Sequence, residues 1–237
     1  MSKVTIVDYG LGNVFSVKKI LEKCGAEVEI SSDPEVIRLS DKLVLPGVGA
    51  FRQGMNALRE RGLDKLIVEY ARSQKPVLGI CLGMQMLFEL GTEFGECKGL
   101  GLIPGSIDII VGKESDGSLL RVPHIGWNSL VPNPQNQSPL DDDVNPWAGT
   151  LLDRLPVGAA FVYFVHSYAA RPTVAEHVLA YFHYGNQTLV AAVRLGAVWG
   201  CQFHPERSGE LGVRIMQNFV RLSAASQASQ KSEQVKK

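Results

Sequence analysis

The sequence predicts an α/β fold: a mostly parallel central sheet flanked by helices, with short antiparallel extensions. Three observations support this prediction. The chain has 237 residues, of which 45% are hydrophobic, enough for one medium-sized domain with a large buried core. Over the first two thirds, short β-branched runs alternate with helical patterns, which is typical of a parallel sheet covered by helices. After Gly105 the chain changes to short strands separated by turns, which favours antiparallel additions.

The first half of the chain contains the predicted parallel strands and the helices between them. Apolar residues recur at helical spacing from Val14 to Cys24, soon after the first strand. We expect one amphipathic helix from Met55 to Arg72 and the start of another from Gly83 to Leu90. The predicted strands are Val4–Val7, Val28–Ile30, Leu43–Leu45 and Val77–Ile80.

The second half adds further strands, a closing helix from Gly212 to Leu222 and two polar segments. We expect residues 131–150 to form an inserted, poorly ordered loop, because Pro132 to Thr150 is rich in Pro, Asn, Gln and Asp. Residues 223–237 are predicted to be a disordered polar tail, which leaves residues 1–222 as the domain. The later predicted strands are Ile107–Val111, Phe161–Val165, Val178–Phe182, Leu189–Val193 and Val198–Phe203.

The composition argues against several classes of protein. Lys plus Arg number 24 and Asp plus Glu number 24, and no stretch is strongly basic, so no nucleic-acid partner is expected. No apolar run approaches the roughly 18 residues of a membrane span. The 4 cysteines are sparse and form no C-x-x-C, unlike a secreted disulfide scaffold. We therefore expect a cytoplasmic protein without a membrane partner.

Cys81 occupies the most informative segment, a G-x-C-x-G that follows an apolar strand and precedes a helical pattern. This is the layout of a nucleophile elbow with cysteine in place of serine. Gly79 and Gly83 let neighbouring backbone pass close to the strained turn. The new helix directs its N-terminal amides at the sulfur, which favours the thiolate. A buried structural cysteine is the alternative interpretation.

His204 and Glu206 follow a second apolar strand in the sequence H-P-E. Residues two apart in extended backbone project to the same side, and Pro205 biases His204 towards extended geometry. Glu206 is therefore expected to orient His204 and stabilise its protonated form, completing a triad with Cys81. Taken alone, H-P-E also fits a surface turn. Cys201 and His204 have the C-x-x-H spacing of zinc ligands, but no second pair lies at comparable spacing, so no metal is expected.

Two glycine-containing loops follow predicted strands. The loop Pro46–Gly49 could present N–H groups to a developing oxyanion, although a plain strand-to-helix turn is the alternative. The segment from Asp8 to Phe15 resembles the start of a dinucleotide fingerprint but lacks its third glycine, so we reject nucleotide binding there. Asn13 within this segment is better explained as a helix cap at a surface that faces a partner.

Three segments together resemble the class I (triad) glutamine amidotransferases: Pro46–Gly49, Gly79–Gln85 and His204–Glu206. Three more are similar to segments of the glutaminase subunits of imidazole glycerol phosphate synthases, from histidine biosynthesis: Asp8–Asn13, Pro123–Asn128 and Tyr163–Tyr168. The resemblance runs from about Lys3 to Leu222 and implies the flavodoxin-like fold of this class.

The resemblance also implies roles for individual residues. Cys81 would attack the side-chain amide of glutamine with His204 as general base, and water would hydrolyse the resulting thioester. N–H groups of Leu82 and of the Val48–Gly49 loop would hold the oxyanion. Substrate contacts are implied for Gln85, Glu93, His166, Ser167 and Tyr168, and partner contacts for Asn13, Trp127, Tyr163 and Arg207. The implied partner is a (β/α)8-barrel cyclase that receives the ammonia, and no cofactor is implied.

The chain departs from this family in three places, and alternatives stay open. Pro132 to Thr150 is longer than the usual connection, and Arg207 stands where the family usually has lysine after H-P-E. The tail after Leu222 has no counterpart in the family. The same chemistry could feed anthranilate, aminodeoxychorismate or pyridoxal phosphate synthesis. A regulatory protein with an inert cysteine and a cysteine peptidase are alternatives from other classes.

Overall fold

The computed structural model describes residues 1–114, 116–136 and 145–222. Its centre is an eight-stranded sheet. Neighbouring strands are parallel from β2 to β14 and antiparallel from β14 to β9, which confirms the predicted α/β class. In spatial order the strands are β2 (Glu27–Ser31), β1 (Lys3–Val7), β3 (Lys42–Leu45), β4 (Val77–Ile80), β14 (Val198–Cys201), β13 (Gln187–Leu195), β12 (Val178–Tyr184) and β9 (Val131–Pro132).

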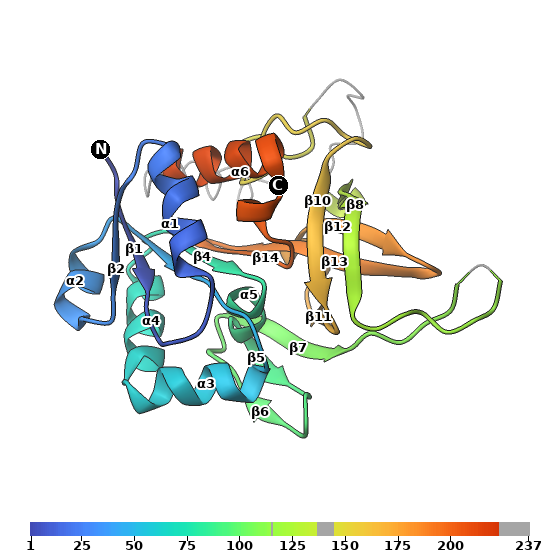
Figure 1. The fold of residues 1–237 in the computed structure, drawn as a ribbon, viewed down its shortest axis with the longest axis horizontal. Helices are drawn as coiled ribbons and strands as arrows, with labels where there is room; N and C mark the ends of the chain where they lie inside the picture. Colours follow the sequence, from blue (N-terminus) through green and yellow to red (C-terminus); the bar gives the residue numbers. More distant parts are fainter. Residues whose placement is uncertain (115, 137–144, 223–237) are drawn as a thin grey trace, which may run out of the picture.

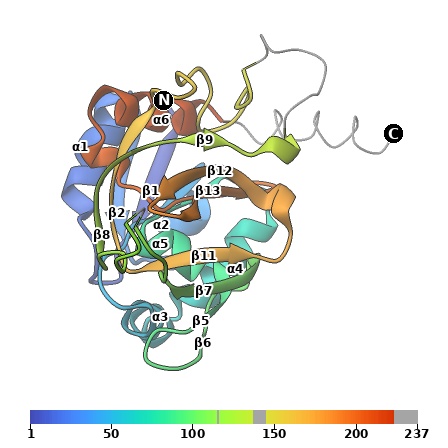
Figure 2. The same cartoon turned by 90° about the vertical axis from the view of Figure 1, so that its right-hand side faces the viewer.

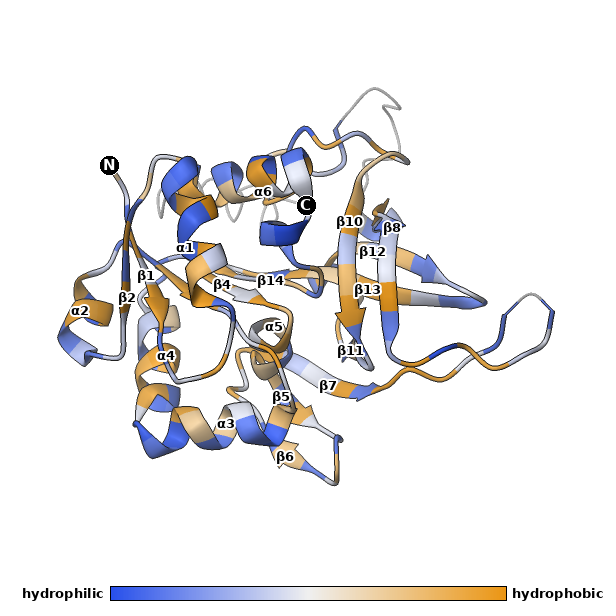
Figure 3. Ribbon diagram, viewed as in Figure 1, coloured by the Kyte–Doolittle hydropathy of each residue, from blue (hydrophilic) through white to orange (hydrophobic). Residues whose placement is uncertain are grey.

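Helices cover both faces of this sheet (Figure 1). One apolar core contains the buried side chains of α1 (Val14–Lys23) and α6 (Gly209–Arg221), and the other contains those of α3 (Phe51–Glu60) and α4 (Leu63–Arg72). Figure 3 shows polar and apolar residues mixed along these helices, as expected when only one side of a helix is buried. The shorter helices are α2 (Pro34–Leu39), α5 (Leu82–Met86) and the 3₁₀ turns Pro134–Asn136, Ala175–His177 and Pro205–Arg207.

Two smaller sheets lie beside the main one (Figure 2). An antiparallel pair consists of β8 (His124–Ser129) and β10 (Phe161–His166). The other sheet has the order β11 (Tyr168–Pro172), β7 (Ile103–Ile109), β5 (Phe88–Gly91) and β6 (Cys97–Lys98). Of these strands, β7 and β10 correspond to strands predicted in the second half of the sequence, and each pairs antiparallel with a neighbour. The strands β5 and β6 were not predicted, and β5 runs parallel to β7.

Two predicted helices are wrong in extent. The single helix expected from Met55 to Arg72 is divided into α3 and α4, because Gly62 adopts a left-handed conformation with φ of 67°. The helix expected from Gly83 to Leu90 ends at Met86, and residues from Phe88 pair with β7 as a strand. A short apolar run fits a buried strand as well as a buried helix, so the spacing of its residues could not separate the two.

The structure describes part of the predicted inserted loop and none of the predicted tail. Residues 137–144 and 223–237 lie outside the described residues. The C-terminal flank of the insert is packed into the core rather than poorly ordered, in contrast to the prediction. Trp147 is fully buried, and its indole N–H donates to the Leu179 carbonyl at 3.2 Å. The residues around Trp147 are mostly polar, so the composition of the segment did not indicate that one large side chain is buried.

The helices of the described residues are all too short or too polar to cross a membrane.

Candidate active site

Cys81 lies at a strained turn between β4 and α5. Its φ of 54° and ψ of −111° fall in a region that non-glycine residues rarely adopt. The glycines on either side are required for close packing: a Cβ on Gly79 would lie 2.6 Å from the Met84 nitrogen, and a Cβ on Gly83 would collide with the Leu45 carbonyl. The elbow geometry that G-x-C-x-G predicts is therefore present. With five residues, α5 is short, and its dipole alone gives the sulfur little support.

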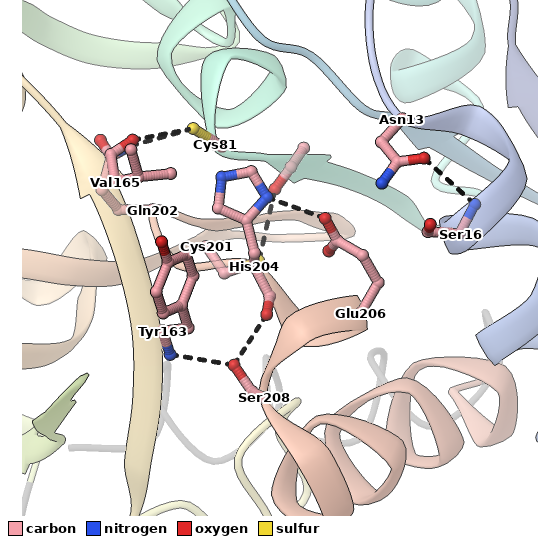
Figure 4. Close-up of polar contacts among 11 residues, drawn as sticks. Asn13, Ser16, Cys81, Tyr163, Val165, Cys201, Gln202, His204, Glu206 and Ser208 are labelled. Carbon is pink, nitrogen blue, oxygen red and sulfur yellow. Dashed lines mark hydrogen bonds and ion pairs between the residues drawn. The ribbon is translucent and has the colours of Figure 1, made fainter. Parts of the chain in front are cut away.

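The imidazole of His204 lies between Cys81 and Glu206 (Figure 4). Its Nδ1 is 2.8 Å from the Glu206 carboxylate, and both side chains are almost completely buried. The Nε2 atom faces Cys81 and makes no hydrogen bond of normal geometry to the described residues. Burial alone would lower the pKa of His204, but interaction with Cys81 and Glu206 raises it to about 10. At neutral pH this environment favours a charged imidazolium beside the sulfur.

Gln202 links Cys81 to Gln85 in the cavity wall through hydrogen bonds, a role that the sequence did not suggest. It is fully buried, and its amide N–H₂ donates to the Cys81 sulfur at 3.7 Å. Its amide oxygen accepts from Gln85 at 3.1 Å, and Gln85 also donates to the Tyr168 carbonyl at 3.1 Å. In the sequence Gln202 is only an amide at the end of an apolar strand, two residues before His204, and its burial is not visible there.

A cavity of ≈ 340 Å³ opens at Cys81. The structure brings together in its walls every residue that was expected to contact substrate or form the oxyanion hole. Glu206 lies behind His204 and is not part of the lining. The cavity is lined by Val48, Gly49, Cys81, Leu82, Gln85, Glu93, Pro123, Val165, His166, Ser167, Tyr168 and His204.

Glu93 and His166 already have partners within the protein. The Glu93 carboxylate accepts from the Phe51 backbone N–H at 2.7 Å, at the start of α3, whose N-cap residue makes no side-chain cap bond. His166 lies 2.9 Å from the Tyr168 carbonyl through Nδ1 and 3.3 Å from His124 through Nε2. Burial lowers the pKa of His166 to about 3, so its ring is neutral and contributes shape and hydrogen bonding rather than charge.

The residues expected to face a partner lie outside this cavity. Trp127 and Tyr163 pack edge to face with ring centroids 5.8 Å apart, and the Arg207 guanidinium lies 4.2 Å from the Tyr163 ring centroid. Asn13 belongs to a different contact: its side chain caps α1 by accepting from the Ser16 N–H at 3.4 Å. The cap that the sequence predicts at Asn13 is confirmed.

Ser208 is a second buried residue that the sequence did not single out. Its hydroxyl donates to the His204 carbonyl at 2.7 Å and accepts from the Tyr163 N–H at 3.0 Å. The His204 N–H in turn donates to the Tyr163 carbonyl at 2.9 Å. The backbone of His204 is therefore tied to β10 in both directions.

Among the described residues, no three His, Cys, Asp or Glu side chains are grouped so that they could hold a metal ion. The Cys201 thiol is fully buried and donates to the Gly79 carbonyl at 3.8 Å.

Comparison with known proteins assigns the family. The sequence model of the class I glutamine amidotransferase family matches residues 5–222. The chain belongs to this family. The amidotransferase is 44% identical over 222 residues to the imidazole glycerol phosphate synthase subunit HisH 1 of Legionella pneumophila (strain Lens), covering 94% of this chain and 100% of the relative. It is 43% identical over 217 residues to the subunit HisH of Geobacillus sp. (strain WCH70), covering 92% and 95%.

Solved structures share the fold of the amidotransferase. The PurLQS structure from Thermotoga maritima has a TM-score of 0.65 at 21% identity, with 92% of this chain and 97% of that chain covered. A crystal structure of a glutamine amidotransferase also has a TM-score of 0.65, at 19% identity, with 92% and 99% covered.

Proposed function

We propose that Cys81, His204 and Glu206 release ammonia from glutamine as the active centre of this amidotransferase. The observation that carries the proposal is the His204 ring, which lies between the Cys81 sulfur and the Glu206 carboxylate at the mouth of a cavity. An imidazolium held in this way stabilises the thiolate, and the thiolate is the nucleophilic form of cysteine.

The reaction follows from these positions. The Cys81 thiolate attacks the side-chain amide carbon of glutamine and forms a tetrahedral intermediate. His204 gives its proton to the departing nitrogen, so the C–N bond breaks and ammonia leaves a thioester on Cys81. Neutral His204 then takes a proton from water, which attacks the thioester carbon. Collapse of the second intermediate releases glutamate and restores the thiolate and imidazolium.

Glu206 and the oxyanion donors support both steps. Glu206 accepts from Nδ1 of His204, which keeps the ring oriented and stabilises its charged form. The N–H of Leu82 and an N–H from Val48 or Gly49 hold the oxyanion, since all three residues line the cavity at Cys81. Gln85, Glu93, His166, Ser167 and Tyr168 contact the rest of glutamine.

The chain is the glutaminase subunit of imidazole glycerol phosphate synthase. The relatives HisH 1 and HisH bear this enzyme's name at 44% and 43% identity over more than nine tenths of the chain. The ammonia passes to a (β/α)8-barrel cyclase subunit in a cytoplasmic heterodimer. An exposed apolar face on β8 and β10 supports a protein partner, because Ile125, Trp127 and Phe161 are each at least half exposed.

Glutamate release tests this function. The chain is assayed with glutamine alone, with a barrel cyclase of the imidazole glycerol phosphate synthase type, and with that cyclase and its nucleotide substrate. We expect a stable complex and the fastest glutamate release when the loaded cyclase is present. Stimulation instead by an anthranilate, aminodeoxychorismate or pyridoxal phosphate synthase subunit would assign the protein to another pathway.

A further inference from the structure

Tyr9 touches the loop that borders the active-site cavity, although it is not a cavity residue itself. It lies two residues after the end of β1, and its side chain is 1% exposed. The hydroxyl donates to the Pro46 carbonyl at 2.7 Å. This carbonyl belongs to the loop Pro46–Gly49, in which Val48 and Gly49 line the cavity.

The first half of the loop Pro46–Gly49 is clamped between two parts of the molecule. A Cβ on Gly47 would collide with the Tyr9 hydroxyl and lie 2.9 Å from the Leu82 Cβ, at the start of α5. Gly12, three residues after Tyr9, packs on the same glycine: a Cβ there would be 3.4 Å from the Gly47 Cα. The segment from Tyr9 to Gly12 therefore holds Pro46 and Gly47 against the start of α5.

The second half of the loop is less restrained. Val48 is 45% exposed, and Gly49 has a φ of 102°, which glycine adopts without strain. The orientation of the N–H groups in this half therefore depends on how the first half is held. Tyr9 is suited to hold it at any working pH, because burial raises its pKa, and the nearby Cys81 raises it further, so the hydroxyl keeps its proton.

We infer that Tyr9 is a positioning residue for the glutaminase reaction: its hydroxyl fixes the Pro46 carbonyl and thereby sets the orientation of the oxyanion donors at Val48 and Gly49. The inference rests on the proposed function. Oxyanion donors act on the transition state more than on bound glutamine, so the hydroxyl contributes to kcat rather than to KM.

The substitution Tyr9→Phe tests this role, because it removes the hydroxyl and keeps the ring. Tyr70→Phe is a matched control: Tyr70 is also buried, at 4% exposed, and its hydroxyl donates to the Ser40 carbonyl at 3.0 Å. Both variants are assayed for glutamate release in complex with the cyclase, for Tm, and for the rate at which iodoacetamide alkylates Cys81. Alkylation builds no oxyanion, so it reports on the thiolate alone.

We expect Tyr9→Phe to lower kcat about tenfold, with KM within about twofold of the wild-type value and unchanged alkylation. Tyr70→Phe is expected to leave kcat unchanged, while both variants lose a similar amount of Tm. Equal kcat values for the two variants, or a Tyr9→Phe effect confined to KM, would overturn the inference. If the wild-type complex itself releases no glutamate, it is the proposed function that fails.

Discussion

At the scale of single residues, the structure unites side chains that are far apart in sequence. β4 and β14 are parallel neighbours, with Ile80 opposite Cys201, so the residues that follow each strand emerge at the same edge of the sheet. Cys81 and His204 meet there. The buried Glu206 helps to raise the pKa of the imidazole, at a site where burial alone would lower it.

Replacing Cys81 should separate glutamine hydrolysis from the partner's reaction. Cys81→Ala should abolish glutamine-dependent product formation by the cyclase complex, because no thioester can form. The same complex should still use added ammonium salts, since the cyclase site is untouched. Product formation is followed with glutamine and then with ammonium as nitrogen source. Persisting glutamine-driven activity would show that another residue is the nucleophile.

The substitution Glu206→Gln should lower the pKa of His204 below its value of about 10, because the amide lacks the charge that favours the imidazolium. An NMR titration of the imidazole measures this shift. The turnover number should fall less than in His204→Ala, since the base is still present. The opposite order of the two variants would contradict the roles assigned here.

The same ion pair makes stability depend on pH. The folded-state pKa of His204 is raised above its ordinary 6.5, so its charged form stabilises the fold fully below about 6.5 and loses this effect as the pH rises through about 10. The gap in unfolding free energy between wild type and Glu206→Gln should therefore shrink over this range. Denaturant titrations at both ends measure it, and a gap that widens with pH would refute the pairing.

Much of the site at residue scale was accessible from sequence, because G-x-C-x-G and H-P-E combine short spacing with a steric reason. Gln202 and Ser208 were not accessible. Their importance depends on which strand lies opposite them: Gln202 reaches Cys81 across β4 and β14, and Ser208 reaches Tyr163 on β10. One strand's sequence does not specify its neighbour's side chains.

At the scale of elements, two glycines determine how closely α5 approaches the sheet. Because Gly79 and Gly83 have no side chains, α5 lies directly against the end of β3 and against β4, the strand that precedes it. Element boundaries were harder to predict than the elements themselves. The left-handed conformation of Gly62 divides one amphipathic pattern into α3 and α4, and the spacing of hydrophobic residues does not predict this conformation.

Gly83→Ala should destabilise the fold, because its Cβ would collide with the Leu45 carbonyl and backbone would have to move. We expect a loss of about 3 kcal/mol or more in unfolding free energy. Gly101→Ala is the control: Gly101 has φ of 64°, and a Cβ there meets nothing within 4 Å, so only backbone strain is added. That strain should cost about 1–2 kcal/mol. Equal losses in denaturant unfolding would show that the contact with Leu45 is unimportant.

At the scale of the whole molecule, the cavity at Cys81 and the exposed apolar face share one pair of strands. The β8 and β10 pair carries Trp127 and Tyr163 outwards, while β10 ends at His166 in the cavity wall. The layered fold was predictable from alternation of strand and helix patterns. The packing of Trp147 was not, since one buried tryptophan in a polar segment does not change the average composition on which that prediction relied.

Trp127→Ala should weaken cyclase binding without unfolding the chain. Trp127 is 53% exposed and its ring packs edge to face against Tyr163, so its removal leaves little cavity. An aromatic anchor at the centre of an interface is typically worth about 2 kcal/mol, or roughly 30-fold in Kd. Calorimetric titration with the cyclase measures the change.

Leu39→Ala is the control for that experiment. Leu39 is 76% exposed on α2, at the opposite end of the molecule from β8 and β10 (Figure 1). Its removal should change neither Kd nor Tm appreciably. If Leu39→Ala weakens the complex as much as Trp127→Ala, the cyclase does not dock on the β8 and β10 face.

The triangle of hydrogen bonds among Tyr163, His204 and Ser208 limits how β10 can shift. His204 both donates to Tyr163 and, through the Ser208 hydroxyl, is linked back to the same residue. If β10 slipped along its axis, it would either break this closed ring or carry the imidazole with it. The His204 imidazole is thus tied to β10 through the backbone of a single residue, Tyr163.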